Sequence, residues 1–326
     1  MEKRTIYSFH SLYRDDFKVE GFSFGSGEKA LCVVGSLRGN EYQQLYTAAH
    51  LVDRLRKLEE NGKLAEGKEI LVIPCANPAS MNIKKRFWSI DNTDINRMFP
   101  GYDQGETTQR IAAGIFEGIK DYKMGIQFAS FYMKGSFMPH VRMMKTGFEN
   151  PELAEKFGLP YIMLREPRPF DTTTLNYNWQ IWETEAFSLY TTNTETVNAK
   201  SSQEAIAAIL HFMKETGLVL ETDFGEDACG SIYRPVKSRI VEDDGIATVR
   251  APRAGFFHSF VRPGERVEKG QLLAQIDSTL DAGRLAEIIA PTSGVILFAH
   301  TESVTYSNSA IFKIIEAAEQ TQEESR

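Results

Sequence analysis

The sequence predicts an α/β protein with a mostly parallel or mixed sheet flanked by helices, followed by a small C-terminal β-sandwich. Short apolar runs typical of buried strands alternate with amphipathic helices up to about residue 220. From about residue 247 the helical patterns stop and an internal repeat of short strands begins. The length of 326 residues suggests two domains, or one large domain with an appendage.

The first domain is expected over residues 1–222. Residues 1–28 alternate in short stretches that contain glycine, which favours an entry hairpin or edge strands. The strands expected after them are Leu31–Val34, Glu69–Cys75, Met124–Ala129 and Ala186–Tyr190, and the expected helices are 41–60, 106–120 and Gln203–Glu215. Fully apolar strands of this kind are typical of a sheet that is covered on both faces.

The C-terminal part is expected to comprise a linker at 223–246, a β-sandwich at 247–316 and a flexible polar tail at 317–326. The run 251–255 (Ala-Pro-Arg-Ala-Gly) is echoed by 290–294 (Ala-Pro-Thr-Ser-Gly), and each copy precedes a strand, a turn and a second strand. This part resembles the barrel-sandwich domains that carry biotin or lipoate. Those carriers need a lysine at the central hairpin, and none occurs between Gly270 and Phe312. A structural cap or an oligomerisation module is therefore the expected role.

Composition excludes several classes of function. With 42% apolar and 25% charged residues, the chain has the composition of a globular protein. A net charge of −7 argues against sequence-independent nucleic-acid binding. The three cysteines are too scattered for a disulfide framework, and Cys32 and Cys75 are expected to be buried thiols. The sequence shows neither a signal peptide nor a membrane-spanning run, so a cytoplasmic location and no membrane partner are expected.

Two motifs carry the chemical information. The segment 35–41 (Gly-Ser-Leu-Arg-Gly-Asn-Glu) follows an apolar strand, and the segment 94–101 reads Asp-Ile-Asn-Arg-Met-Phe-Pro-Gly. Together with Asn77-Pro78, Pro139–Arg142 and Asn178–Gln180, they resemble the succinylglutamate desuccinylase/aspartoacylase family. That family is a branch of the zinc carboxypeptidase (M14-type) fold. The resemblance covers nearly the whole chain.

The resemblance implies a metal-dependent hydrolase of amide bonds, of the N-acyl amino acid deacylase or carboxypeptidase class. In that family a histidine and a glutamate of the first motif, with a later histidine, hold one zinc ion. The zinc ion activates a water molecule. A further glutamate acts as general base, and the Asn-Arg pair of the second motif binds the substrate carboxylate. A small carboxylate or an N-acyl amino acid is therefore the expected partner.

The metal and base positions depart from the family pattern. Glu41 matches the carboxylate ligand, but Arg38 stands at the first histidine position and Gln127 at the second. A guanidinium cannot bind a metal, and an amide is a poor zinc ligand. Tyr190 stands at the general-base position, with Glu185 and Glu195 nearby as alternatives.

The ligand-binding positions are better preserved. By the same resemblance, the expected ligand-binding residues are Arg86, Asn96, Arg97, His140 and Arg142. His140 has a second interpretation as a replacement metal ligand, and Arg97 has one as a core salt-bridge residue. Asp94 is expected within the second motif, with simple turn chemistry as its alternative.

Arg38 has a physical role of its own in this sequence. Without a metal, Glu41 would be a buried carboxylate that lacks a compensating charge, which is costly. We therefore expect Arg38 and Glu41 to form an ion pair in the place of the metal. The alternative is that Arg38 points to solvent.

Three functions remain open at this point. The favoured one is a degenerate or divergent member of the family, a pseudoenzyme candidate that keeps a small carboxylate-binding pocket. The second is an active zinc amidohydrolase with a shifted metal site. The third is a scaffold or a regulatory partner of an intact paralogue. Zinc is an expected cofactor only under the second, and the sequence leaves room for a homo-oligomer under all three.

Overall fold

The computed structural model describes residues 1–220 and 233–317, which divide into two compact units. Unit 1 comprises Met1–Ser130 and Pro139–Ile240, and unit 2 comprises Phe131–Met138 together with the chain from Val241. The boundary at residues 240 and 241 falls inside the segment predicted as a linker. Residues 221–232, with Cys229, and most of the predicted tail lie outside the described residues.

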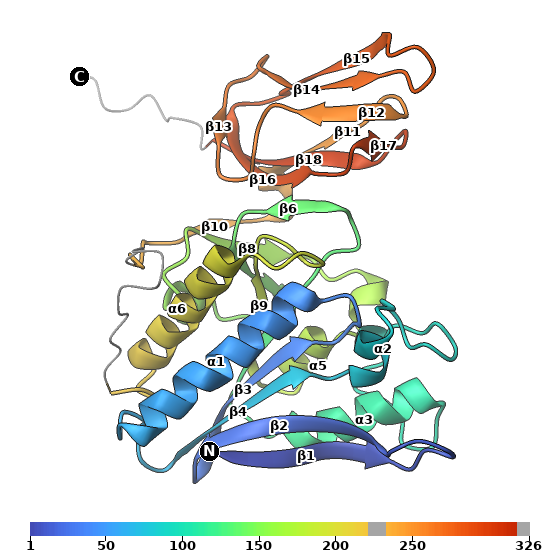
Figure 1. The fold of residues 1–326 in the computed structure, drawn as a ribbon. Coiled ribbons are helices and arrows are strands. Elements are labelled where there is room, and N and C mark those ends of the chain that lie inside the picture. Colours follow the sequence, from blue (N-terminus) through green and yellow to red (C-terminus); the bar gives the residue numbers. More distant parts are fainter. Residues whose placement is uncertain (221–232, 318–326) are drawn as a thin grey trace, which may run out of the picture. The chain divides into compact units, whose positions relative to one another are not determined.

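Unit 1 is built on a large mixed sheet that has nine strands in the described chain, in the order β1-β2-β4-β3-β5-β9-β7-β8-β10 (Figure 1). The central neighbours β4, β3, β5 and β9 run parallel, whereas the hairpin β1–β2 and the pair β7–β9 are antiparallel. The strands are β1 Glu2–Phe9, β2 Phe17–Gly25, β3 Glu28–Ser36, β4 Lys68–Cys75, β5 Met124–Ala129, β7 His140–Met144, β8 Tyr161–Arg165, β9 Glu185–Tyr190 and β10 Arg239–Val241.

Helices flank both faces of this sheet, as the sequence predicts. The helices are α1 Tyr42–Glu60, α2 Pro78–Asn82, α3 Thr107–Ile119, α4 Pro151–Glu155, α5 Leu175–Ile181 and α6 Ala199–Glu215, with short 3-10 turns at Ile95–Arg97 and Pro169–Asp171. On one face α1 and α6 lie side by side and bury Leu51, Leu55 and Phe212 (Figure 1). On the other face α3 and α5 bury Ile115 and Trp179. No helix within residues 1–220 and 233–317 is long and apolar enough to cross a membrane.

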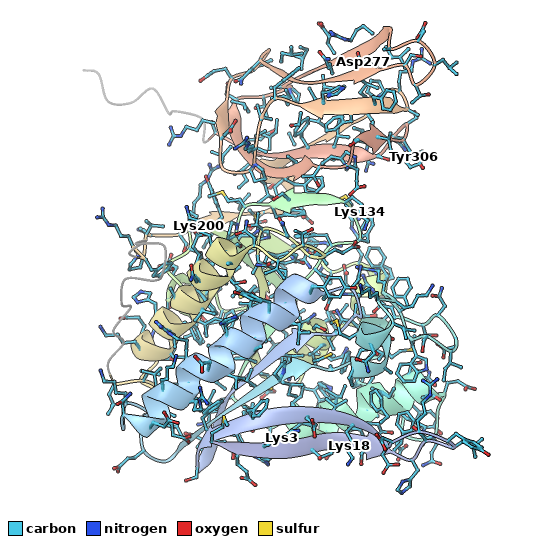
Figure 2. All side chains as sticks on the ribbon, in the orientation of Figure 1. Lys3, Lys18, Lys134, Lys200, Asp277 and Tyr306 are labelled. Atoms are coloured by element: carbon cyan, nitrogen blue, oxygen red, sulfur yellow. The ribbon has the colours of Figure 1, made fainter. Side chains whose placement is uncertain are left out.

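Unit 2 contains two antiparallel sheets that share one apolar core, in which Phe257 and Ile276 meet Ile296 and Ile314. Within the described residues, one sheet has the order β15-β14-β12-β17 and the other has the order β11-β18-β16-β13. The strands are β11 Ile246–Arg250, β12 Gly255–Ser259, β13 Arg266–Val267, β14 Leu272–Asp277, β15 Arg284–Ile289, β16 Gly294–His300, β17 Val304–Thr305 and β18 Ala310–Glu316. Asp277, labelled in Figure 2, ends β14 and pairs with Arg284 across the hairpin.

The sequence did not reveal that one strand of unit 2 comes from the middle of the chain. Strand β6, Gly135–Phe137, pairs antiparallel with β16, and the Phe137 ring packs against Phe298 at 4.5 Å between centroids. Both ends of this excursion return to unit 1, at Ser130 and at Pro139. A single short strand carries too little periodicity to identify its partner from sequence.

Candidate functional site

The site forms where the parallel strands β3, β5 and β9 end. The carboxyl ends of neighbouring parallel strands meet at one edge of a sheet, so the residues that follow them are brought together. Arg38 and Glu41 follow β3, Ser130 follows β5, and Tyr190 is the last residue of β9. The turn between β3 and α1 packs tightly: a Cβ on Gly39 would come within 2.2 Å of the Lys85 carbonyl oxygen, so only glycine fits.

Glu41 directly precedes α1, and its carboxylate turns back toward the preceding strand. Its Oε2 accepts hydrogen bonds from the backbone N–H groups of Leu37, at 2.7 Å, and Arg38, at 3.0 Å. Its Oε1 accepts from the Arg38 Nη1 at 3.0 Å and from the Ser130 hydroxyl. The residue is only 1% exposed. The ion pair predicted between Arg38 and Glu41 is therefore present and buried.

Arg38 has a second partner, Asp94. The Nε of Arg38 lies 3.0 Å from both carboxylate oxygens of Asp94, and its Nη2 lies 2.9 Å from Oδ2. Asp94 also caps the Ile95–Arg97 turn, since its Oδ1 accepts from the Asn96 N–H at 3.0 Å. Asp94 therefore has the turn role that was the alternative interpretation of the sequence, and it also binds Arg38 within the site. We refer to Arg38, Glu41, Asp94 and Ser130 as the arginine cluster.

The electrostatics of the arginine cluster keep Arg38 charged. Burial alone would lower the pKa of the Arg38 guanidinium, but Asp94 and Glu41 outweigh it and raise that pKa above its usual value. Arg86 lies beside the cluster and places its Nη1 3.4 Å from the Asn40 Oδ1. Burial, together with the like charge of Arg38, lowers the pKa of Arg86.

Gln127, which the family resemblance predicts at the second metal position, is 4% exposed, and its Oε1 has no hydrogen-bond partner among the described residues. Tyr190 is buried as well. Burial raises the pKa of its phenol, against the opposing effect of Arg142, Arg165 and Arg38. A neutral phenol is a weak base. Of the alternative carboxylates, Glu185 stands at the opposite end of β9, and Glu195 is exposed and accepts from the Asn40 Nδ2 at 2.8 Å.

The antiparallel strand β7 adds His140 and Arg142 to this edge. The buried His140 ring stacks on the Tyr190 ring, with 4.6 Å between centroids and 5° between planes. The Arg142 guanidinium lies 4.5 Å from the centroid of the same ring. No side-chain hydrogen bond or ion pair of Arg142 is found within the described residues, so its charge has no carboxylate partner there.

The remaining predicted residues lie beside α5. Asn96 is buried, and its Oδ1 accepts from the Leu175 N–H at 3.1 Å. Arg97 stacks on Phe170 and lies 3.4 Å from Asp171, whose other oxygen accepts from Arg165 at 2.8 Å. The Asp171 carboxylate therefore forms ion pairs with two arginines, Arg97 and Arg165. Burial and the nearby charge of Arg142 lower the pKa of Arg165.

As for a metal, only Glu41 among the three predicted positions carries an anionic ligand. In the part of the chain that the structure describes, no three His, Cys, Asp or Glu side chains form a group that could hold a metal ion. Ser130, Arg165 and Asp171 also belong to the site and were not predicted from the sequence. A threonine that can cap a helix follows Asp171 at position 174, and this was a local signal for this part of the site.

The large mixed sheet with helices on both faces, and a polar site at the ends of its parallel strands, define the class: an α/β protein with its candidate site at the carboxyl edge of the sheet. The model of the succinylglutamate desuccinylase/aspartoacylase catalytic domain matches residues 27–216. The protein therefore belongs to the succinylglutamate desuccinylase/aspartoacylase family, as its two motifs indicate.

Several relatives are similar over most of their length. The N-alpha-acetyl-L-2,4-diaminobutyric acid deacetylase of Halomonas elongata is 25% identical over 292 residues, which cover 83% of this chain and 77% of that protein. The succinylglutamate desuccinylase/aspartoacylase structure from Rhodobacter sphaeroides has a TM-score of 0.76 at 19% identity and covers 96% of this chain and 95% of its own. The product-bound ectoine utilization protein EutE (DoeB) from Ruegeria pomeroyi has a TM-score of 0.74 at 17% identity, with 93% and 92% covered.

Proposed function

We propose that this protein binds a small carboxylate ligand and does not hydrolyse amides through a zinc ion. The observation that carries the proposal is the buried guanidinium of Arg38, bonded to both Glu41 and Asp94. It stands at a position where the family resemblance places a metal ligand. In this view Arg38 supplies the positive charge that a metal would otherwise bring to Glu41.

The residues at the three metal positions do not fit zinc. Arg38 is a cation without a lone pair, and Gln127 offers only a neutral amide oxygen. Both carboxylate oxygens of Glu41 already accept hydrogen bonds: Oε2 from two backbone N–H groups and Oε1 from Arg38. A divalent ion beside Glu41 would also face the charge of Arg38, about 3 Å from that carboxylate.

Carboxylate binding is supported by the charge balance around Tyr190. Arg97 and Arg165 share the Asp171 carboxylate, whereas Arg142, which lies over the Tyr190 ring, has no carboxylate partner among the described residues. A planar guanidinium held against an aromatic ring is well suited to bind a carboxylate with two parallel hydrogen bonds. We assign the main ligand contact to Arg142, with Arg86, Asn96, Arg97 and His140 as further ligand-binding residues.

The relatives favour an N-acyl amino acid, or a closely related small carboxylate, as the ligand, because the Halomonas protein is named as a deacetylase of such a compound. We also place unit 1 in the zinc carboxypeptidase-like branch and class unit 2 as a barrel-sandwich. We expect a cytoplasmic location.

Calorimetric titration of the full chain with a panel of N-acyl amino acids and dicarboxylates tests this proposal. Saturable binding that Arg142→Met weakens roughly 10- to 100-fold, without turnover of the ligand, is the expected result. Zinc-dependent hydrolysis would instead favour the active enzyme with a shifted metal site. Failure of every carboxylate to bind would favour the scaffold or regulatory role.

A further inference from the structure

Two asparagines on α5 are equally buried but differ in their bonding. Asn176 and Asn178 are each 2% exposed. The Nδ2 of Asn178 donates to the carbonyl oxygens of Thr172 at 3.0 Å and Thr174 at 2.9 Å. Neither amide atom of Asn176 has a partner among the described residues. Burying an amide without partners opposes folding, so such a group calls for an explanation outside the fold.

Two further buried atoms without partners in the described chain lie on the face of the sheet that α5 covers. The Leu175 N–H bonds to Asn96, which places Asn176 next to the second motif. Trp179, on the same side of α5, has an indole N–H without a partner in the described chain, and packs against Gly125 so closely that a Cβ there would come within 2.7 Å of the ring. Gln127 lies two residues further along β5 and therefore shares a face of the sheet with Gly125.

The strand register connects these groups to the unpaired arginine. Gln127 on β5 is directly opposite Ser188 on β9, and Ser188 is directly opposite Arg142 on β7. Residues directly opposite each other in a sheet point to the same face. Two strand spacings separate Gln127 from Arg142, or about 10 Å between backbones. A small molecule with a carboxylate at one end and a polar group at the other can span this distance between long side chains.

We infer that Asn176, together with Gln127, recognises an uncharged group of the ligand that both donates and accepts a hydrogen bond, as a carboxamide does. The Asn176 amide offers an NH2 donor group and an acceptor oxygen, and the Gln127 Oε1 offers a further acceptor. This inference rests on the proposed function, in which Arg142 binds the carboxylate of the same ligand. Asn176 is then a specificity-determining residue that no family motif identified in the sequence.

A ligand-binding role and a structural role predict opposite effects on stability. Asn176→Leu removes two buried amide atoms without breaking any hydrogen bond in the described chain, so it should raise the denaturant midpoint. Gln127→Met should act in the same direction. The matched control is Asn178→Leu, two residues away, which removes the donor to two carbonyl oxygens and should lower the midpoint.

Three ligands of nearly equal shape distinguish the contributions of the two hydrogen bonds to affinity. N-acetylglycine carries the amide N–H and C=O, 4-oxopentanoate lacks the N–H, and pentanoate lacks both. For the native chain we expect the affinity to fall about tenfold at each step, because a site built to hydrogen-bond a ligand rejects the analogue that lacks the group. In the double variant Asn176→Leu/Gln127→Met the three affinities should lie within about threefold of one another, near that of pentanoate, and Asn176→Leu alone should reduce the discrimination.

The outcomes separate this inference from the proposed function. Suppose that the native chain binds all three ligands with equal affinity and that Arg142→Met weakens the binding of each. That result would overturn the inference and leave the proposed carboxylate binding intact. If none of the three ligands binds, both the inference and the proposed function are overturned. Destabilisation by Asn176→Leu would reveal a structural partner and overturn the inference, as would unchanged discrimination in that variant.

Discussion

The arginine cluster and the row Gln127–Ser188–Arg142 lie at the same edge of one sheet, yet their bonding differs. In the arginine cluster the guanidinium of Arg38 meets two carboxylates, and both oxygens of Glu41 accept hydrogen bonds. In the row, Arg142 lacks a carboxylate and the Gln127 Oε1 lacks a donor within the described residues. The first region is bonded within the chain and should stabilise the fold. The second leaves bonding capacity for a ligand.

The largest expected effect follows from removing the centre of the arginine cluster. Arg38→Met leaves Glu41 and Asp94 buried without a counter-charge, so the free energy of unfolding should fall by about 3–5 kcal/mol. Denaturant unfolding measures this change. The control is Arg97→Met, whose half-exposed side chain lies 3.4 Å from Asp171 and should cost less than about 1 kcal/mol. If the two substitutions lower the free energy of unfolding equally, the arginine cluster contributes no more to stability than a partly exposed ion pair does.

Glu41→Ala should come next. It removes the acceptor of two backbone N–H groups, but Arg38 keeps Asp94 as a partner. We expect a loss of about 3 kcal/mol, smaller than that of Arg38→Met, in the same unfolding experiment. If Glu41→Ala is neutral, the ion pair contributes nothing to stability and the contrast between the two regions fails.

In the open row, ligand binding should change more than stability. Arg142→Met should weaken carboxylate binding roughly 10- to 100-fold, since a charge-assisted contact is lost. Its effect on unfolding should stay below about 1 kcal/mol, because only the contact with the Tyr190 ring disappears. Arg142→Lys is the control: it keeps the charge but loses the planar fork, and should bind with intermediate affinity. Titration calorimetry measures the affinity. If Arg142→Met binds the carboxylate with native affinity, Arg142 does not contact the ligand.

Much of the fold could be predicted from the sequence because its strands and helices have strong periodicity. The strand Met124–Ala129 was predicted with its observed bounds, and Gln203–Glu215 lies within the longer helix α6. The short strands β7 and β8 were missed, since each has only five residues, too few to show a clear period of alternation. Strand β6 was missed because its partner lies far along the chain.

For the site, local motifs predicted local contacts and little more. The pair Arg38–Glu41 spans three residues and was predicted, whereas the contacts of Arg38 with Asp94 and Ser130 span 56 and 92 residues and were not. Asn176 differs from Asn178 only in its surroundings, which no property of the residue type reveals. Bonding between distant segments depends on the sheet register, and the register cannot be read from one strand at a time.

The smallest expected effect concerns Tyr190, whose pKa is raised by burial. A raised pKa means that its contribution to stability is complete below the unfolded phenol pKa of about 10 and is lost as the pH rises through the folded value. Tyr190→Phe cannot ionise, so the native chain should lose stability relative to this variant only above about pH 10. Denaturant unfolding at a series of pH values measures the difference. A constant difference would show that Tyr190 is solvated.

The central claim is that the Arg38 guanidinium takes the place of a metal beside Glu41, and zinc analysis tests it most directly. The full chain would be purified from zinc-supplemented medium, dialysed against metal-free buffer and analysed by mass spectrometry for metals. We expect a small fraction of one zinc ion per chain, and the same content in Glu41→Ala. One zinc ion per chain in the native protein, lost in Glu41→Ala, would contradict the claim.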